Sequence, residues 1–311
     1  MRTIILLLLL LGVGNLPQLS ACEACGCSIM FWEMGLTPRF QSHQLSIGWN
    51  HQRFTSYSSL EAKALGQIGS EEYFQQMDLQ LQLRLHDRWR LSVALPYAFL
   101  QREIAGETWN LNGWSDPSVL LQYVVLDQEN KKRTEWRHRL SAGVGAKLPW
   151  GQQAKLPEED NTQVNFRLGT GSLDGMAYLQ YVLRRGDWGL SADVLASRNG
   201  ENEEDYRYGH RWSGHLTVFN VIASGKLGIM PSLGLYRETA AEDVQRGYYR
   251  SHTGGQYTFG QLGLQVFFPA FSTTLRYQHP LEQKWAEGLT EAGGRMTVQF
   301  TYFFGGKPLG S

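Results

Sequence analysis

The chain has no excess charge of either sign and, after its first residues, no long hydrophobic run. Its 29 basic and 29 acidic side chains cancel. This balance gives no reason to expect a nucleic-acid partner, because duplex binding depends on a basic surface. No stretch beyond the N-terminus reaches the roughly 18 apolar residues of a membrane helix. If the mature protein lies in a membrane, it must therefore do so as a β-barrel.

Motifs of the common catalytic sites are also missing. The sequence contains no Gly-x-Ser-x-Gly, no His-Glu-x-x-His and no phosphate-binding loop. The 8 histidines are scattered singly along the chain. An enzyme would need a nucleophile and a base that the sequence does not display, so we predict a protein without catalytic activity.

Residues 1–21 have the pattern of a secretory signal peptide. Arg2 supplies the basic start, and the apolar run Ile4–Val13 is too short to cross the roughly 30 Å hydrocarbon core of a bilayer. The sequence Leu19-Ser20-Ala21-Cys22 also resembles the lipobox of bacterial lipoproteins, in which Cys22 would carry a lipid. Both routes predict an exported chain that begins at Cys22.

The rest of the chain shows the two-residue period of β-strands. Met77, Leu79 and Leu81 alternate with Asp78 and Gln80, for example, as expected when one face is apolar and the other polar. About twelve such segments are separated by turn residues. The expected strands cover residues 40–55, 73–86, 89–103, 115–126, 134–149, 173–184, 187–199, 206–223, 226–238, 256–268, 270–279 and 294–305.

The connections between these segments alternate between short turns and long polar loops. This alternation is typical of outer-membrane barrels, in which the short turns and both chain ends face the periplasm. The sequence thus predicts an all-β fold, an antiparallel transmembrane β-barrel of about 12 strands with a short N-terminal plug segment. A secreted two-sheet sandwich is the main alternative. The expected parts are a signal peptide (1–21), a cysteine-containing plug segment (22–39), the barrel (40–305) and a C-terminal tail (306–311).

Several short motifs follow one another along the expected barrel: Leu91–Tyr97, Gly113–Pro117, Gly143–Pro149, Leu168–Ser172 with Asp174, Asp205–Gly209, His252–Gly255 and Tyr277–Pro280. Together, in this order, they resemble an outer-membrane family named after meta-pathway phenol degradation. Members of that family are often called transporters, and they are distantly similar to the FadL-type channels for hydrophobic compounds. The resemblance implies a barrel that passes small hydrophobic molecules. The tail after Phe304 departs from the family, because barrels usually end on an aromatic residue that the assembly machinery reads.

Three cysteines form the sharpest local signal. Cys22, Cys25 and Cys27 are spaced so that their thiols can converge on one soft metal, either Cu(I), Zn(II) or an iron–sulfur cluster. In an oxidising compartment two of them can instead form a local disulfide. Lipidation of Cys22 is compatible with either alternative.

The apolar segment after the cysteines is a candidate plug for the barrel lumen. Its residues Phe31, Trp32, Glu33 and Met34 would be costly to leave in water, which favours insertion into the lumen. The alternatives are that the segment caps the periplasmic mouth or lies at the bilayer surface.

Charged residues on the polar face of the strands would line the lumen. A basic lining would attract anionic or polarised solutes. Alternatively, the arginines pair across the barrel with Asp78, Asp193 and plug residues such as Glu33. The predicted lining residues are Asp78, Arg84, Arg90, Arg139, Lys147, Asp193, Arg211, Arg276 and Arg295.

These observations predict a bacterial outer-membrane channel or transporter for a small solute, gated by its N-terminal segment. The expected partners are outer-membrane lipid, the solute and the barrel assembly machinery, without nucleic acid. The alternative function is an envelope metal-binding or redox-sensing protein, in which the cysteines act and the barrel is a scaffold.

Overall fold

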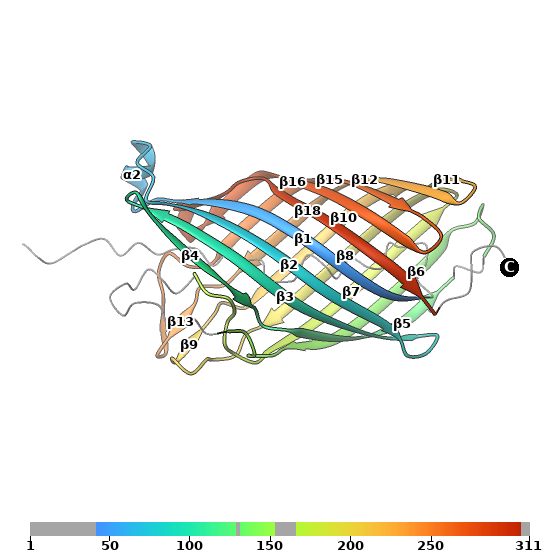
Figure 1. Ribbon diagram of the computed structural model, residues 1–311, viewed down its shortest axis with the longest axis horizontal. Helices are drawn as coiled ribbons and strands as arrows, with labels where there is room; N and C mark the ends of the chain where they lie inside the picture. The colour runs from blue at the N-terminus through green and yellow to red at the C-terminus, as the bar shows by residue number, and fades with distance from the viewer. Residues whose placement is uncertain (1–41, 129–130, 153–165, 306–311) are drawn as a thin grey trace, which may run out of the picture.

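The computed structural model describes residues 42–128, 131–152 and 166–305. Twelve strands of this part form a closed antiparallel barrel, in which β18 pairs with β1 (Figure 1). The prediction of an antiparallel barrel of this size is therefore confirmed. The barrel strands are β1 (His43–Ser56), β2 (Ser70–Arg84), β3 (Trp89–Ile104), β5 (Ser118–Asp127), β6 (Arg137–Lys147), β7 (Asp174–Arg185), β8 (Trp188–Arg198), β10 (Arg211–Asn220), β12 (Leu227–Ala240), β15 (Gly255–Phe267), β16 (Phe271–Trp285) and β18 (Arg295–Phe304).

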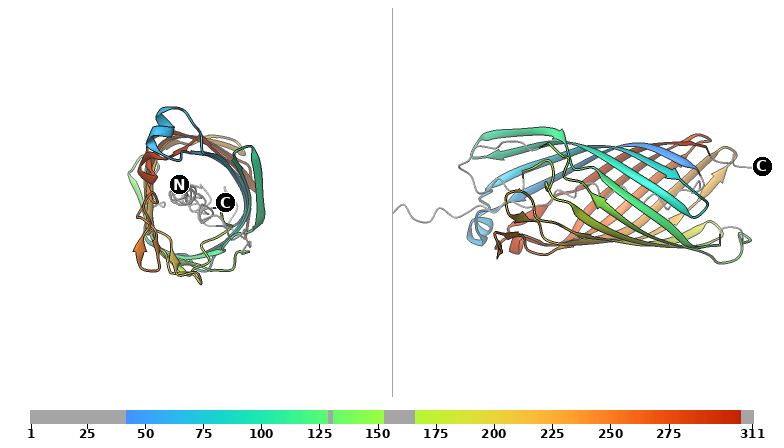
Figure 2. Two further views of the ribbon diagram at one scale, coloured as in Figure 1. Left: turned by 90° about the vertical axis from the view of Figure 1, so that its left-hand side faces the viewer. Right: turned by 90° about the horizontal axis from the view of Figure 1, so that it is seen from below.

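Short turns gather at one end of the barrel and long connections at the other (Figures 1 and 2). We call these the short-turn end and the long-loop end. No helix among residues 42–128, 131–152 and 166–305 is long and apolar enough to cross a membrane. The long connections hold the remaining small elements: α2 (Leu60–Ala64), β4 (Glu107–Trp114), β9 (Tyr206–Arg207), β13 (Val244–Gln245), β14 (Tyr248–Tyr249), η4 (Ala286–Gly288) and β17 (Thr290–Ala292), whereas β11 (Ile222–Ser224) lies at the short-turn end.

Alternate side chains of each strand face opposite sides of the barrel wall. In β1, Ile47 is 47% exposed on the outside, whereas its neighbour Ser46 is 1% exposed on the inside. The same contrast holds between Leu79 and Gln80 in β2. Exposed Trp89, Trp188 and Tyr302 lie near the strand ends of the short-turn side, where a membrane interface favours such rings. The exterior thus fits lipid and the interior does not.

Several of the expected strand boundaries are wrong, and two of them change the number of strands. Residues 104–114 were expected to form a loop, but Ala105 and Gly106 adopt positive φ values of 51° and 86° and turn the chain into β4, which pairs with β3. The segment 206–223 was expected to be one strand, but it divides into β9 and β10. Gly209 lies at the break, where a Cβ atom would come within 1.9 Å of the Ala241 carbonyl oxygen.

A charge on the outer face tests whether this surface meets lipid. We expect Leu79→Arg, near the middle of β2, to lower the free energy of unfolding from lipid vesicles by about 2–4 kcal/mol. The control Gln101→Arg, on the outer face nearer the long-loop end, should cost about 1 kcal/mol or less. Urea titrations of both variants in vesicles measure the difference, and equal costs would contradict a membrane-embedded mid-barrel.

Candidate functional site

The interior face toward the short-turn end is lined by amide and hydroxyl side chains. Gln82 Nε2 lies 3.4 Å from both Ser92 Oγ and Gln122 Oε1. Gln80 is fully buried, and neither of its polar side-chain atoms has a hydrogen-bond partner among the residues that the structure describes. Buried polar atoms normally bind protein groups or water, so this surface is suited to water or a polar solute.

Charged residues predicted to line the lumen lie at several depths of the interior. The carboxylate of Asp193 lies 3.1 Å from His215 Nδ1. The carboxylate of Asp78 accepts hydrogen bonds from the side-chain amides of Gln76 and Asn50. The buried members of the predicted set are Asp78, Arg90, Arg139, Asp193, Arg211 and Arg295, whereas Arg84, Lys147 and Arg276 are partly exposed.

Toward the long-loop end the interior is occupied by a cluster of aromatic rings and ion pairs, which we call the aromatic–arginine layer. Glu238 is 1% exposed, and its carboxylate lies 3.0 Å from Arg211 Nη1 and 3.7 Å from Arg295 Nη1. The Tyr236 hydroxyl donates a hydrogen bond of 2.8 Å to the same carboxylate. The guanidinium of Arg295 lies 4.2 Å from the centre of the Phe259 ring. Other rings in the layer belong to Phe54, Phe74, Tyr257 and Trp285.

Part of the connection between β6 and β7 folds into this layer. Phe166 and Leu168 are each 3% exposed and belong to the same apolar cluster as Phe54 and Trp285. The Arg102 guanidinium stacks over the Phe166 ring and donates two hydrogen bonds to buried Glu72. The long-loop end of the lumen therefore also contains Phe166 and Leu168, which belong to the described residues 166–173 of this connection. We call these residues the inward loop.

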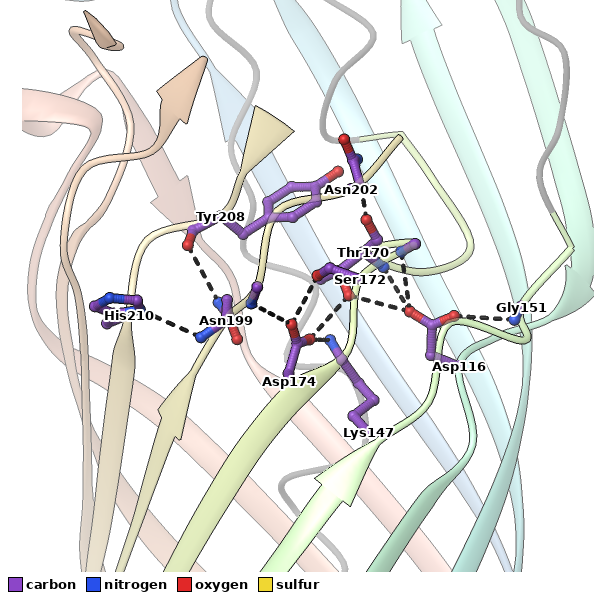
Figure 3. Close-up of polar contacts among 12 residues, drawn as sticks. Asp116, Lys147, Gly151, Thr170, Ser172, Asp174, Asn199, Asn202, Tyr208 and His210 are labelled. Atoms are coloured by element: carbon purple, nitrogen blue, oxygen red, sulfur yellow. Dashed lines mark hydrogen bonds and ion pairs between the residues drawn. The ribbon is translucent and has the colours of Figure 1, made fainter. Parts of the chain in front are cut away.

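The carboxylate of Asp116 joins the inward loop, through Thr170, to the first part of the same connection, through Gly151. It accepts hydrogen bonds from the backbone N–H of Gly151 at 2.9 Å and of Thr170 at 2.7 Å (Figure 3). The Thr170 hydroxyl and the Gly171 N–H also donate hydrogen bonds to this carboxylate, at 3.2 and 3.3 Å. Hydrogen bonds to an ionised acceptor are the strong ones, so we describe Asp116 as a loop clamp.

A second buried carboxylate, Asp174, extends the clamp toward the next connection. It accepts hydrogen bonds from the hydroxyls of Thr170 and Ser172, and it pairs with Lys147 Nζ at 2.8 Å. The N–H of Gly200 also donates to it, which joins the loop between β8 and β10 to the cluster (Figure 3). Two loops of the long-loop end are thus fixed to the barrel rim by one polar network.

His210 borders this network as a neutral base. Burial, and then the positive charges of Arg207 and Arg198, lower the pKa of His210 below its ordinary value. Its Nδ1 atom accepts the N–H of Asn199 at 3.2 Å, which requires that nitrogen to be unprotonated. Both effects favour the neutral imidazole, which this hydrogen bond requires.

A glycine beside the clamp gives a direct test of its geometry. A Cβ atom on Gly169 would lie 2.4 Å from Asp116 Oδ2, whereas a Cβ atom on Gly175 would meet nothing within 4 Å. We expect Gly169→Ala to displace the carboxylate and to destabilise the loop by about 1–3 kcal/mol. The measurement is the rate of trypsin cleavage after Arg167. Equal rates for Gly169→Ala and the control Gly175→Ala would contradict the clamp.

Sequence reasoning missed most of the acids in this site. Glu72, Glu238 and Asp174 were not counted among the lumen residues, so the lining is less basic than predicted. Glu238 could have been predicted as a lumen residue, because it is two positions from Tyr236 and therefore faces the same, interior side of β12. Asp116 and Asp174 lie in motifs that were noted for their resemblance to a family and not for a structural role.

The predicted metal site and plug cannot be placed. Cys22, Cys25, Cys27, Phe31, Trp32, Glu33 and Met34 all lie outside the described residues. Within the ranges that the structure covers, no group of three or more histidine, cysteine, aspartate or glutamate side chains is arranged to hold a metal ion.

Comparison with known proteins identifies the fold. The sequence matches no protein-family model and no curated protein. An outer-membrane channel from Pseudomonas putida F1 aligns with a TM-score of 0.59 and 14% identity, covering 86% of this chain and 99% of that chain. The β-domain of a Bordetella autotransporter (TM-score 0.46, 11% identity, 85% and 100% covered) and the CymD monoaromatic hydrocarbon channel (0.38, 8%, 85% and 90%) are more remote. The chain has the fold of an outer-membrane β-barrel.

Proposed function

We propose that the protein is a passive channel for a small solute in the bacterial outer membrane. The observation that carries this proposal is the contrast across one closed wall, which is apolar outside and lined by buried amide, hydroxyl and charged groups inside. A barrel without a solute path would be more stable with apolar side chains in its interior, because buried polar atoms without hydrogen-bond partners are destabilising. Gln80 is such a group.

The long-loop end is the closed end of this path in the proposed mechanism. The aromatic–arginine layer, Phe166 and Leu168 fill the interior there, and the Asp116 clamp holds the inward loop in place. Solute would pass when this loop moves away from the layer. The fold supports the usual orientation, in which short turns face the periplasm and long loops face outward.

The N-terminal segment is a proposed second barrier, from the periplasmic side. Deleting residues 22–39 should raise conductance if Phe31, Trp32 and Met34 plug the lumen. No change in conductance on deletion would assign the closure to the long-loop end alone. The solute, the outer-membrane lipid and the barrel assembly machinery are the partners that this function requires.

The proposal is tested with the purified full-length chain in planar lipid bilayers. Discrete conductance steps are expected, rare for the native chain and frequent when the clamp is weakened. Folded protein that conducts in neither form would contradict the channel.

A further inference from the structure

Arg295 presents one edge of its guanidinium group to the interior of the aromatic–arginine layer without an acceptor. The side chain is 2% exposed, and its Nη1 atom lies 3.7 Å from the Glu238 carboxylate. Nε and Nη2 form another edge of the planar group, on which two N–H bonds point the same way. Neither atom has a hydrogen-bond partner among the described residues. This edge therefore holds two buried donors whose acceptor is missing from the described part of the chain.

Glu238 does not compensate this edge. Its carboxylate lies closer to Arg211 Nη1, at 3.0 Å, than to Arg295 Nη1, at 3.7 Å. The contact with Arg295 uses Nη1, so it leaves the Nε–Nη2 edge available. A charged donor that is buried without an acceptor is destabilising, and more so than a neutral one. Binding of an acceptor to this edge would offset that cost.

A third donor of the same layer also lacks a partner. The Trp285 side chain is fully buried, and its indole Nε1 has no hydrogen-bond partner in the ranges that the structure covers. The indole stacks on Tyr257 with 4.8 Å between the ring centres, and the guanidinium carbon of Arg295 lies 5.7 Å from the centre of the same ring. The two side chains with unpartnered donors thus lie against one tyrosine.

Apolar groups surround these donors. The guanidinium of Arg295 lies 4.2 Å from the centre of the Phe259 ring, and Leu289 and Ala292 belong to the same buried cluster as Trp285. Hydrogen bonds and ion pairs are stronger in such surroundings than in water. The inward loop already packs a phenyl ring, that of Phe166, into this cluster. An apolar body of similar size therefore suits the space that the loop would leave on moving away.

A carboxylate is the acceptor that matches this arrangement. Its two oxygens can accept the two N–H bonds of one guanidinium edge in a bidentate manner. A phosphate group would bury further charged oxygens among apolar side chains, which is costly. A hydrocarbon offers no acceptor and would leave all the donors without a partner.

We propose that the Nε–Nη2 edge of Arg295, together with the indole N–H of Trp285, is a binding site for the carboxylate of a small apolar carboxylic acid. The apolar body of the acid packs against the buried cluster when the inward loop moves away. This inference rests on the proposed channel function and specifies its solute class. The required anionic group distinguishes this class from the purely hydrophobic molecules that the family resemblance implies.

The first test is titration calorimetry of the full-length chain in detergent micelles, with benzoate as the probe and benzamide as its uncharged control. We expect saturable benzoate binding, and benzamide binding that is weaker by about tenfold or more, because an ionised acceptor forms stronger hydrogen bonds. The Asp116→Asn chain should bind benzoate more tightly than the native chain, because its binding-competent fraction is larger. Binding of benzoate by neither chain, or equal binding of benzamide, would overturn the site.

Two conservative variants test the donors. Arg295→Lys keeps the charge without the planar edge and should weaken benzoate binding by about tenfold or more. Trp285→Phe keeps an aromatic ring without the N–H and should weaken it by about threefold. The matched control Arg237→Lys changes an exposed arginine that pairs with Glu282, and it should bind as the native chain does. Native affinity in folded Arg295→Lys, or in Trp285→Phe if the lysine variant does not fold, would overturn the site.

These binding measurements do not depend on conduction. A chain that conducts in planar bilayers but binds no benzoate would keep the proposed channel and overturn this site. A chain that binds benzoate but never conducts would keep the site and reject the channel.

Discussion

Asp116→Asn is expected to release the inward loop and to open the long-loop end. The native carboxylate accepts hydrogen bonds from Gly151, Thr170 and Gly171, whereas an amide offers one acceptor oxygen and places an NH2 group against other donors. Losing these charge-assisted bonds should cost about 3 kcal/mol, which is about a hundredfold in the open fraction of the loop. Trypsin cleavage after Arg167 should accelerate by a similar factor.

The control for this variant is Glu203→Gln. Glu203 is an exposed acid in the connection between β8 and β10, at the same end of the barrel. Its replacement removes one negative charge without touching the clamp, so cleavage should keep its native rate. If both variants were cleaved at the native rate, Asp116 would have no role in holding the loop.

Glu238→Gln should have the largest effect on the stability of the barrel itself. Its carboxylate lies between Arg211 and Arg295, and neutralising it leaves two buried guanidiniums without their shared counter-charge. Removing one partner of a buried ion pair typically costs about 3–5 kcal/mol. Urea unfolding in detergent micelles or vesicles, followed by tryptophan fluorescence, measures the loss.

The matched control is Glu282→Gln on the outer face. Glu282 forms an exposed pair with Arg237, with a separation of 3.5 Å and side-chain exposures of 56% and 43%. Such pairs contribute about 1 kcal/mol or less. Similar losses in the two variants would show that Glu238 is solvated and that the aromatic–arginine layer does not fill the interior.

The fold could be predicted from the sequence because a barrel wall imposes a local pattern. Successive side chains of a strand face opposite sides of the wall, so that Leu79 faces outward and Gln80 faces the lumen. This alternation can be read from a short segment of the sequence. The strand ends were harder to predict. The hairpin at Ala105 and Gly106 lacks the asparagine–glycine signal of a two-residue turn, and β16 continues to Trp285 through a register shift near Phe259.

The candidate site could be predicted only in part, because its contacts join distant segments. Asp116 meets Thr170 across 54 positions of the sequence, and Arg295 of β18 meets Glu238 of β12 past the intervening strands β16 and β15. Neither pairing has a signal in composition or spacing. The interior aromatic rings were also unexpected, since Phe54 and Trp285 occupy the lumen phase of strands whose apolar residues otherwise face outward. These rings pack in one cluster with Phe166 and Leu168 of the inward loop.

The central claim is that the barrel is a channel closed at its long-loop end. The most direct measurement is the conductance of the full-length native chain and of Asp116→Asn in planar bilayers, each confirmed as folded by its β-sheet circular dichroism. The account predicts rare openings of the native chain and frequent openings of the variant. A variant that is cleaved rapidly after Arg167 but conducts no better than the native chain would contradict it.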